Sequence, residues 1–248
     1  MQNSITVFTD HTPYGQAALA HAQKLAQIFN AEVNSVSLQE KPNLRAVFAA
    51  ADEGNTLCFV MPVATSKKLT FFNLTKARKW IRKSRVPVLT VGNEDAKEND
   101  YQQIVLPLDV NCQEKELALW ASYFPAYFQK NCPGIKKEEV SIHIIYNEYK
   151  NRLLNQKVQN NVDFAIQMFD NLEVNYQLHP FQKVDNIYIF GLQFAKKRQN
   201  SVMLFLMTKH YSLIDLLFRP VEHSIIGNSE QVSVLCLNAR DDTFVLCQ

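Results

Sequence analysis

Glycine is scarce in this sequence. Only six of the 248 residues are glycine, whereas average usage of ~7% would give about 17. No two of them lie closer than 36 residues, at Gly15, Gly54, Gly92, Gly134, Gly191 and Gly227. Phosphate-binding loops need closely spaced glycines, because only glycine lets the backbone approach the phosphates and adopt positive φ. The spacing excludes both the G-x-G-x-x-G and the G-x-x-x-x-G-K-[ST] motifs.

Paired cysteines and long apolar runs are also missing. The five cysteines are odd in number and form no C-x-x-C pair, so neither a disulfide framework nor a zinc ribbon is expected. No wholly apolar run is longer than the six residues 202–207, against the ~20 of a membrane-spanning helix. The first residues contain no basic region followed by an apolar stretch, which argues against a secretory signal. These features predict a soluble cytoplasmic protein with reduced thiols.

Charge is distributed unevenly along the chain, although the formal net charge is only +2. Residues 1–92 carry an excess of six positive charges, the octet 93–100 (NEDAKEND) an excess of three negative charges, and residues 101–248 an excess of one negative charge. The octet has almost no apolar side chain to bury, which is typical of a linker. We therefore expect two domains, over residues 1–92 and 101–248, joined by residues 93–100.

Both halves open with an apolar, β-branched strand that ends in an aspartate. The two strands are expected over residues 4–10 and 103–109, so that they end at Asp10 and Asp109. Ligands of open α/β sheets bind at the carboxyl ends of the strands, which makes both aspartates candidate ligand residues. The alternative, which we favour, is that each carboxylate hydrogen-bonds the loop that follows it.

An amphipathic helix is expected after each of these strands. Thr12 followed by Pro13 is a typical helix start, and Asn111 with Glu114 three residues later fits a capping box. Apolar residues follow at helical spacing in both halves. Pro125 lies inside the second of these helices and is expected to kink or end it.

Both halves also close in the same way, with an apolar strand, a helix and a β-branched strand. These are expected over residues 56–63, 69–83 and 86–92 in the first half and over residues 201–207, 212–226 and 231–237 in the second. Between its ends, the second half has room for a strand, helix, strand and helix over residues 140–146, 149–172, 173–178 and 184–198. The first half has only residues 42–52 left after a strand over residues 32–38. One strand and one long helix are therefore expected to be missing from it.

Strands that alternate with helices in this way predict parallel βαβ units with helices on both faces of the sheet. The expected fold class is α/β, with two tandem open parallel-sheet domains, of which the first is abridged. The aspartate-ending strands resemble those of the universal stress protein family. The closing segments ARKWIRKSRVPVLTVG and LIDLLFRPVEHSIIGNSEQVSVLCLN resemble that family as well.

The resemblance covers nearly the whole chain as a tandem repeat and is weaker in the middle of the first copy. It implies a five-stranded parallel sheet in the order 3-2-1-4-5 for a complete copy. It also implies that two such units pair, here within one chain, with a homodimer as a further possibility.

The resemblance also implies that the nucleotide site is absent from both copies. Family members that bind ATP carry G-x(2)-G-x(9)-G-[ST] between the fourth strand and the last helix. The matching positions hold no glycine: they are Pro62, Thr65 and about 74–75 in the first copy, and Thr208, Tyr211 and about 219–220 in the second. Proline at 62 and 220 also lacks the N–H that such a loop would use. Only Asp10 and Asp109 match the acid that ends the first strand of nucleotide-binding members, so no cofactor is expected.

A basic segment runs from Lys76 to Arg85, and no acid occurs between Asn55 and Asn93. On a helix, Arg78, Lys79, Arg82 and Lys83 would share the face opposite Ala77, Trp80, Ile81 and Ser84. Such a face could bind nucleic acid or an acidic partner. A solvated face near a helix C-terminus is the interpretation we favour, because the sequence pI of about 8.2 is low for a nucleic-acid-binding domain.

Signals for metal binding and catalysis are absent. The six histidines show no H-E-x-x-H spacing, and no cysteine lies within four residues of any of them, so no local metal site is expected. There is no G-x-S-x-G turn to present a nucleophilic serine. Cys112 lies near an expected helix N-terminus, where a thiol pKa can fall, but no resolving cysteine accompanies it.

The leading hypothesis is a cytoplasmic universal stress-type protein that does not bind ATP, is not an enzyme, spans no membrane and acts by associating with a protein partner. The alternative is a sensor of a nucleotide or another small molecule, with a non-standard site around Asp109, Thr208, Lys209 and His210. A third hypothesis, weak binding of anions or nucleic acid by the helix over residues 76–85, ranks below these two.

Overall fold

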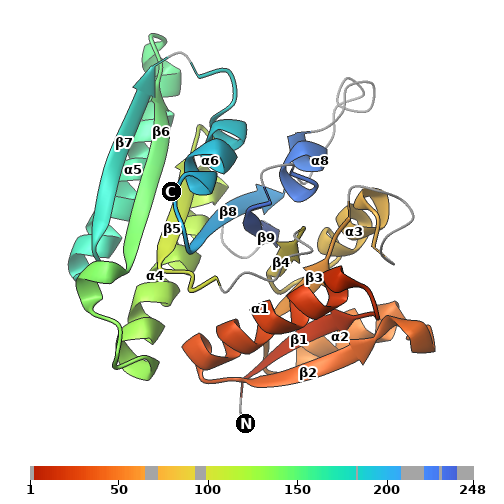
Figure 1. Cartoon of the computed structure of the whole chain (residues 1–248). Coiled ribbons are helices and arrows are strands. Elements are labelled where there is room, and N and C mark those ends of the chain that lie inside the picture. The colour runs from red at the N-terminus through yellow and green to blue at the C-terminus, as the bar shows by residue number, and fades with distance from the viewer. Residues whose placement is uncertain are drawn as a thin grey trace.

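The computed structural model describes residues 3–64, 72–92, 99–182, 184–207, 221–228 and 231–238. Within them, nine strands form a single sheet with helices on both faces (Figure 1). None of the helices in these ranges is both long and apolar enough to cross a membrane.

The first half of the chain contributes four strands and three α-helices. The strands are β1 (Ser4–Thr9), β2 (Glu32–Ser37), β3 (Thr56–Pro62) and β4 (Val88–Val91), and the helices are α1 (Pro13–Phe29), α2 (Leu44–Glu53) and α3 (Leu74–Ile81). A single 3-10 turn, η1 (Leu38–Glu40), precedes α2. As expected, α2 leads from β2 to β3 with no further strand between them, so the third strand of a complete unit is missing here.

The second half contributes five strands. They are β5 (Gln103–Leu108), β6 (Ser141–Glu148), β7 (Tyr176–Gln182), β8 (Ser201–Met207) and β9 (Ser233–Asn238). The described helices are α4 (Lys115–Asn131), α5 (Arg152–Asn171), α6 (Ile187–Lys196) and α8 (Val221–Ile226), with 3-10 turns η2 (Cys112–Glu114) and η3 (Lys137–Glu139). Of the helix expected over residues 212–226, the part before Val221 lies outside the described residues.

The strand order is β2-β1-β3-β4-β9-β8-β5-β6-β7. Within each half the paired strands are parallel, and the second half has the predicted order 3-2-1-4-5. β4 and β9 join the halves as an antiparallel pair, with Leu89 opposite Leu235. Because the halves meet antiparallel, the carboxyl ends of their strands lie at opposite edges of the sheet.

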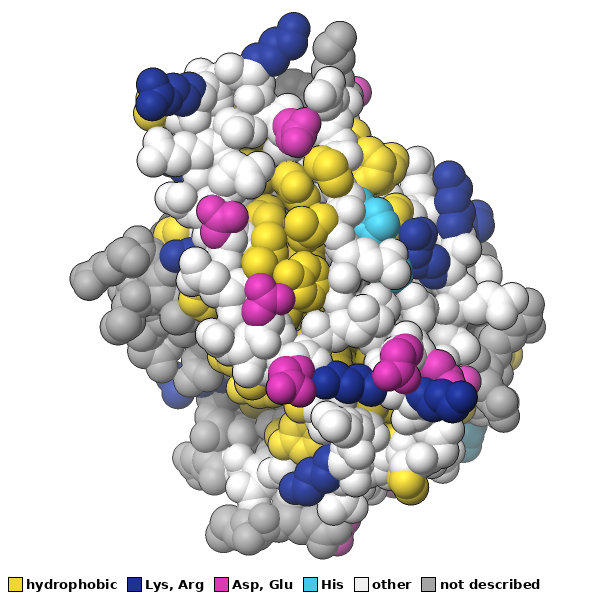
Figure 2. Space-filling model, turned by 90° about the vertical axis from the view of Figure 1, so that its left-hand side faces the viewer, with side chains coloured by type: hydrophobic (Ala, Val, Ile, Leu, Met, Phe, Trp, Pro, Cys, Tyr) yellow, Lys and Arg dark blue, Asp and Glu magenta, His cyan; other side chains and the backbone are white. Residues whose placement is uncertain are grey.

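The burial pattern explains why these segments form strands. Every residue of β8 is buried, as expected for a central strand covered on both faces. The edge strands β2 and β7, at the two ends of the sheet (Figure 1), are mostly half-buried or exposed. Figure 2 shows the molecule from the side of β7, which is the left-hand side of Figure 1. On this face, hydrophobic side chains form a strip with acidic side chains along its margin. Leu178 of β7 is 41% exposed.

The two halves share their hydrophobic cores. One cluster of buried residues lies on the face covered by α1, α4 and α5, and the other on the face covered by α2, α3, α6 and α8. On the first face, the ring of Phe29 in α1 lies 5.3 Å from that of Phe124 and 5.1 Å from that of Tyr127, both in α4. The Asn131 amide donates to the Ile28 carbonyl at 2.7 Å. The seam between the halves is therefore packed as an interior.

The predicted helix starts have different outcomes. Thr12 caps α1 as expected, because its hydroxyl accepts from the Gly15 N–H at 3.2 Å and Pro13 is the first helical residue. Asn111 instead caps the 3-10 turn η2, and α4 begins only at Lys115. The capping-box prediction for Glu114 was wrong, because its side chain accepts from the Asp109 N–H rather than from that of Asn111.

Some boundaries also differ from the prediction. α4 continues through Pro125 to Asn131, which excludes one of the two outcomes expected of this proline, an end of the helix. β7 begins three residues later than predicted, because the residues between α5 and β7 form the hydrogen-bonded turn that ends α5. Glu173 adopts φ 52° and the Val174 N–H bonds the Phe169 carbonyl at 2.9 Å, which closes the helix before the strand can start.

Candidate functional site

Asp10 follows β1 and binds its own loop. One carboxylate oxygen accepts from the Thr12 N–H at 3.1 Å and also from the Thr12 hydroxyl. The first turn of α1 lies directly against it, and a Cβ added to Gly15 would come within 2.5 Å of the Asp10 carbonyl oxygen. Asp10 thus anchors the start of α1, and Gly15 is the glycine that allows this close approach.

Asp109, the matching residue after β5, is held by distant parts of the chain. Its carboxylate accepts from the Tyr149 hydroxyl at 2.8 Å, and its carbonyl accepts from the Asn161 amide at 2.7 Å. Its N–H donates to Glu114. The Asn161 amide also reaches the Asn111 carbonyl at 2.8 Å, which fixes the whole loop after β5.

Glu114 lies at the centre of this arrangement and is only 1% exposed. One carboxyl oxygen accepts from the Asp109 N–H and the other from the Tyr188 hydroxyl of α6. The pKa of Glu114 is raised to about 8: burial raises it most, the hydrogen bonds from the Tyr188 hydroxyl and the Asp109 N–H lower it, and the charge of Asp109 adds a smaller upward contribution. The carboxyl is therefore mostly protonated at neutral pH.

Both tyrosines of this group stay protonated and act as donors. Burial raises the pKa of Tyr149, and the hydrogen bond to Asp109 adds to the effect. Burial also raises the pKa of Tyr188 well above its ordinary value, with the neighbouring Glu114 as the next cause. We call these five residues the Asp109 cluster: Asp109, Glu114, Tyr149, Asn161 and Tyr188.

The structure does not bring the two predicted aspartates together. Asp10 and Asp109 follow strands of different halves, and the antiparallel β4–β9 pair places them at opposite edges of the sheet. Thr208, Lys209 and His210 follow β8 directly but lie outside the described residues.

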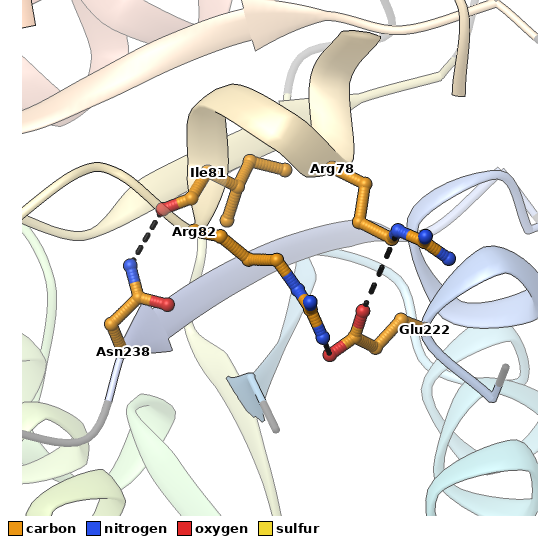
Figure 3. A network of polar contacts seen from close by, with 5 residues as sticks. All are labelled: Arg78, Ile81, Arg82, Glu222 and Asn238. Atoms are coloured by element: carbon orange, nitrogen blue, oxygen red, sulfur yellow. Dashed lines mark hydrogen bonds and ion pairs between the residues drawn. The ribbon is translucent and has the colours of Figure 1, made fainter. Parts of the chain in front are cut away.

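The basic helix α3 contacts the other half of the chain. Glu222 of α8, 2% exposed, accepts from Arg82 at 2.9 Å, and Arg78 Nε lies 3.9 Å from its second oxygen. Figure 3 shows both arginines reaching from α3 toward this carboxylate. The favoured interpretation of a wholly solvated basic face was therefore wrong for these two arginines. Lys79 and Lys83, in contrast, are exposed.

Two more contacts fix the same seam. The Asn238 amide at the end of β9 donates to the carbonyls of Ile81 and Ser84, at 2.6 and 2.7 Å (Figure 3 shows the first). A Cβ on Gly227, just after α8, would lie within 3.0 Å of Leu74 Cγ at the start of α3. The basic segment thus serves as part of the packing between the halves.

The remaining candidate groups are the possible metal ligands and the cysteines. No three histidine, cysteine or acidic side chains there are placed to hold a metal ion. Cys58 and Cys236 are buried, and burial raises the pKa of both thiols, that of Cys58 to about 12. They are inert core thiols at neutral pH. Cys112 is exposed in η2.

Sequence reasoning missed most of the partners in these contacts. Tyr149, Tyr188 and Glu222 were not singled out, because their partners lie 40, 74 and 140 residues away along the chain. The one available signal was that Glu222 lies within the closing segment that carries the family resemblance.

Comparisons with known proteins give a clear result only at the level of structure. No protein-family model matches the sequence, and no curated protein matches it. A universal stress protein from Archaeoglobus fulgidus DSM 4304 superposes with a TM-score of 0.69 at 11% identity, covering 97% of this chain and 100% of that one. A functionally unknown protein from Pseudomonas aeruginosa PAO1 gives 0.64 at 14% identity, covering 99% and 95%.

A third solved structure, of a protein from Pseudomonas aeruginosa UCBPP-PA14 assigned to the universal stress proteins, gives a TM-score of 0.61 at 15% identity. The match covers 99% of this chain and 96% of that one. All three likenesses run over essentially the full length of both chains, as the tandem arrangement predicts. At this level of identity they establish the architecture, and the chain therefore has the fold of the universal stress proteins.

Proposed function

We propose that this chain is a universal stress-type protein of the cytoplasm that does not bind ATP. In this proposal it is not an enzyme and acts in the stress response by associating with another protein. The full-length likeness to universal stress proteins supports the class of role. The arrangement around Asp109 supports the loss of nucleotide binding.

The Asp109 cluster is the observation that carries the proposal. Asp109 directly follows β5, which lies beside β8 at the point where the strand order reverses, and ligands of open α/β sheets bind at such points. Its carboxylate, N–H and carbonyl all have partners within the chain. A nucleotide would have to replace these bonds with others of equal strength, and no glycine-rich loop follows either fourth strand to supply backbone donors.

Thermal unfolding of the full chain with ATP, ADP and AMP tests this part of the proposal. We expect no stabilisation, whereas a ligand present at 100 times its Kd would stabilise the fold by about 2.7 kcal/mol. A stabilisation by any of them that Asp109→Asn removes would overturn the proposal. It would favour instead the small-molecule sensor with a site around Asp109, Thr208, Lys209 and His210.

Association with a protein needs a separate measurement. Chemical cross-linking in cells that make the chain, before and after stress, is expected to yield a discrete cross-linked partner whose yield rises with stress. Sedimentation of the purified chain separates two cases, since a mass of 28.5 kDa would mean a monomer and twice that mass a homodimer. A chain that stays monomeric and cross-links to nothing under either condition would contradict the proposal.

A further inference from the structure

β7 is an open edge of the sheet, because it pairs with β6 on one side only. The Asn175 carbonyl, just before β7, accepts from the Ile142 N–H of β6 at 3.0 Å. Successive residues of a strand turn their backbone groups to opposite sides. The N–H and C=O groups of Tyr176 and Leu178 therefore point away from β6. This edge offers backbone donors and acceptors to a further strand.

The same residues of β7 also present apolar side chains. Tyr176 points to the face covered by α5, because the centre of its ring lies 5.9 Å from that of Phe169. Side chains alternate between the two faces along a strand, so Leu178 and Pro180 lie on this face too, and both are exposed. Figure 2 shows an apolar strip on this side of the molecule. β2, the other edge strand, carries none of the large exposed hydrophobic side chains found in the described part of the chain.

Acidic side chains lie beside this apolar surface at both ends of β7. Asp170 of α5 accepts from the tyrosine hydroxyl at the start of β7 at 2.9 Å. Burial raises the pKa of Tyr146, and the charges of Glu148 and Asp163 raise it further, so both acids lie close to that ring. Tyr146 is directly opposite Pro180 in the β6–β7 pair. None of the three carboxylates is in an ion pair among the described residues, so their negative charge is available to a partner.

These acids decide which kind of partner fits the edge. A second copy of the chain, paired edge to edge, would bring the acids of both copies together, and like charges there are unfavourable. Pro180 also removes one outward N–H, which is a device by which edge strands avoid pairing with themselves. A segment that carries Lys or Arg beside an apolar residue complements both the charge and the apolar surface.

We propose that the outer edge of β7 binds an extended segment of another protein as an additional strand of the sheet. The segment has an apolar side chain that lies against Leu178, and on either side of it a Lys or Arg that meets Asp163, Asp170 or Glu148. Backbone hydrogen bonds supply affinity and the side chains select the partner. This inference deepens the proposed function and rests on its claim that the chain acts by associating with a protein.

NMR titration of the ¹⁵N-labelled full chain with two synthetic heptapeptides tests the edge. TKTLTKT places its lysines and its leucine on one side of a strand, and TETLTET is the matched control with glutamates. We expect the lysine peptide to shift the amide signals of Tyr176 and Leu178 and the glutamate peptide to leave both unchanged. Asp163→Asn should weaken binding of the lysine peptide by about two- to fivefold. Glu40→Gln, which removes an exposed acid from the first half, should leave the affinity unchanged.

Two substitutions at one position separate the backbone from the side chain. Leu178→Pro removes the outward N–H and spares the bonds to β6, and edge positions of this kind accept proline. Leu178→Ala shortens the side chain and keeps the N–H. We expect Leu178→Pro to bind the lysine peptide about threefold or more weakly than Leu178→Ala does, since one hydrogen bond is lost. Asp163→Asn remains as the test if the proline variant fails to fold.

Three outcomes of these measurements would overturn the proposal. The two peptides could shift the same signals equally, or the lysine peptide could shift neither signal. The chain could also form a homodimer that Leu178→Pro dissociates, in which case a second copy occupies the edge.

Cross-linking in stressed cells separates this inference from the proposed function. A partner captured equally by the wild type and by Leu178→Pro would overturn the β7 site and leave the proposed function standing. If no partner is captured although the lysine peptide binds as expected, the proposed function is overturned and the β7 edge stands as a binding surface.

Discussion

The two halves differ in what fills the space beside the aspartate that follows their first strand. Five residues after Asp10 the chain has Gly15, and five residues after Asp109 it has Glu114. In the first half, α1 begins at once and its first turn packs against the aspartate, where a side chain has no room. In the second half, the 3-10 turn η2 comes first and the Glu114 side chain fills the space.

This difference shows how one sequence pattern can acquire two structural roles. The Asp10 loop depends on contacts within about five residues of chain. The Asp109 loop depends on Tyr149, Asn161 and Tyr188, which come from outside the loop. A local pattern predicts the first arrangement well, whereas the second exists only once the second half has folded around it.

The largest expected effect is that of Glu114→Leu. The substitution leaves the Asp109 N–H and the Tyr188 hydroxyl without acceptors in a buried place, and each such loss costs about 1–3 kcal/mol. We expect the free energy of unfolding in urea to fall by about 2–6 kcal/mol. Glu138→Leu, on the surface turn η3, is the control and should change stability by less than about 0.5 kcal/mol. Equal effects for the two variants would mean that Glu114 anchors nothing.

The second prediction concerns pH and belongs to the second half alone, since Gly15 has nothing to titrate. The folded-state pKa of Glu114, about 8, lies above its ordinary value of 4.5. Between these values the folded chain holds more protons than the unfolded chain, so stability falls as pH rises through that window. The slope that Glu114 contributes is at most about 1.4 kcal/mol per pH unit.

The matched variant for this prediction is Glu114→Gln, which has nearly the same shape but no titrating proton. Urea unfolding of both proteins between pH 5 and pH 8 should show the wild type losing stability relative to the variant as pH rises. A constant difference across the range would mean that the Glu114 carboxyl is ionised throughout in the folded chain. The Asp109 cluster would then be held by charge rather than by a neutral acid.

The sequence predicts most of the strands and helices along the chain because the signals for them are local, whereas the strand order of the second half was implied by the family resemblance alone. Apolar strands, helix-length connections and turn residues are read within short windows, and the missing third strand of the first half follows from counting the residues left over. The position of β7 was missed because the end of α5 depends on the left-handed conformation of Glu173, which no apolar periodicity reports.

The sequence does not determine which side chains form hydrogen bonds or ion pairs with one another. Glu114 has the spacing of a capping box, yet one of its carboxyl oxygens accepts a hydrogen bond from the hydroxyl of Tyr188, 74 residues away. Arg78 and Arg82 have the pattern of a solvated basic face, yet a buried carboxylate 140 residues from Arg82 binds them. In each case the side chain has several chemically equal partners within the sequence, and only the packing of distant elements selects one.

Gly15→Ala is the smallest of the three effects and tests the first half of the comparison directly. The added methyl would lie within 2.6 Å of the Asp10 backbone nitrogen, so α1 must move away from β1. Overpacking of this kind costs about 1–3 kcal/mol. Gly134→Ala is the matched control, because a Cβ there meets nothing within 4 Å, and a smaller unfolded-state entropy should make it neutral or stabilising by up to about 1 kcal/mol. If both alanines were tolerated equally in urea unfolding, the close approach of α1 to Asp10 would not be what keeps glycine at position 15.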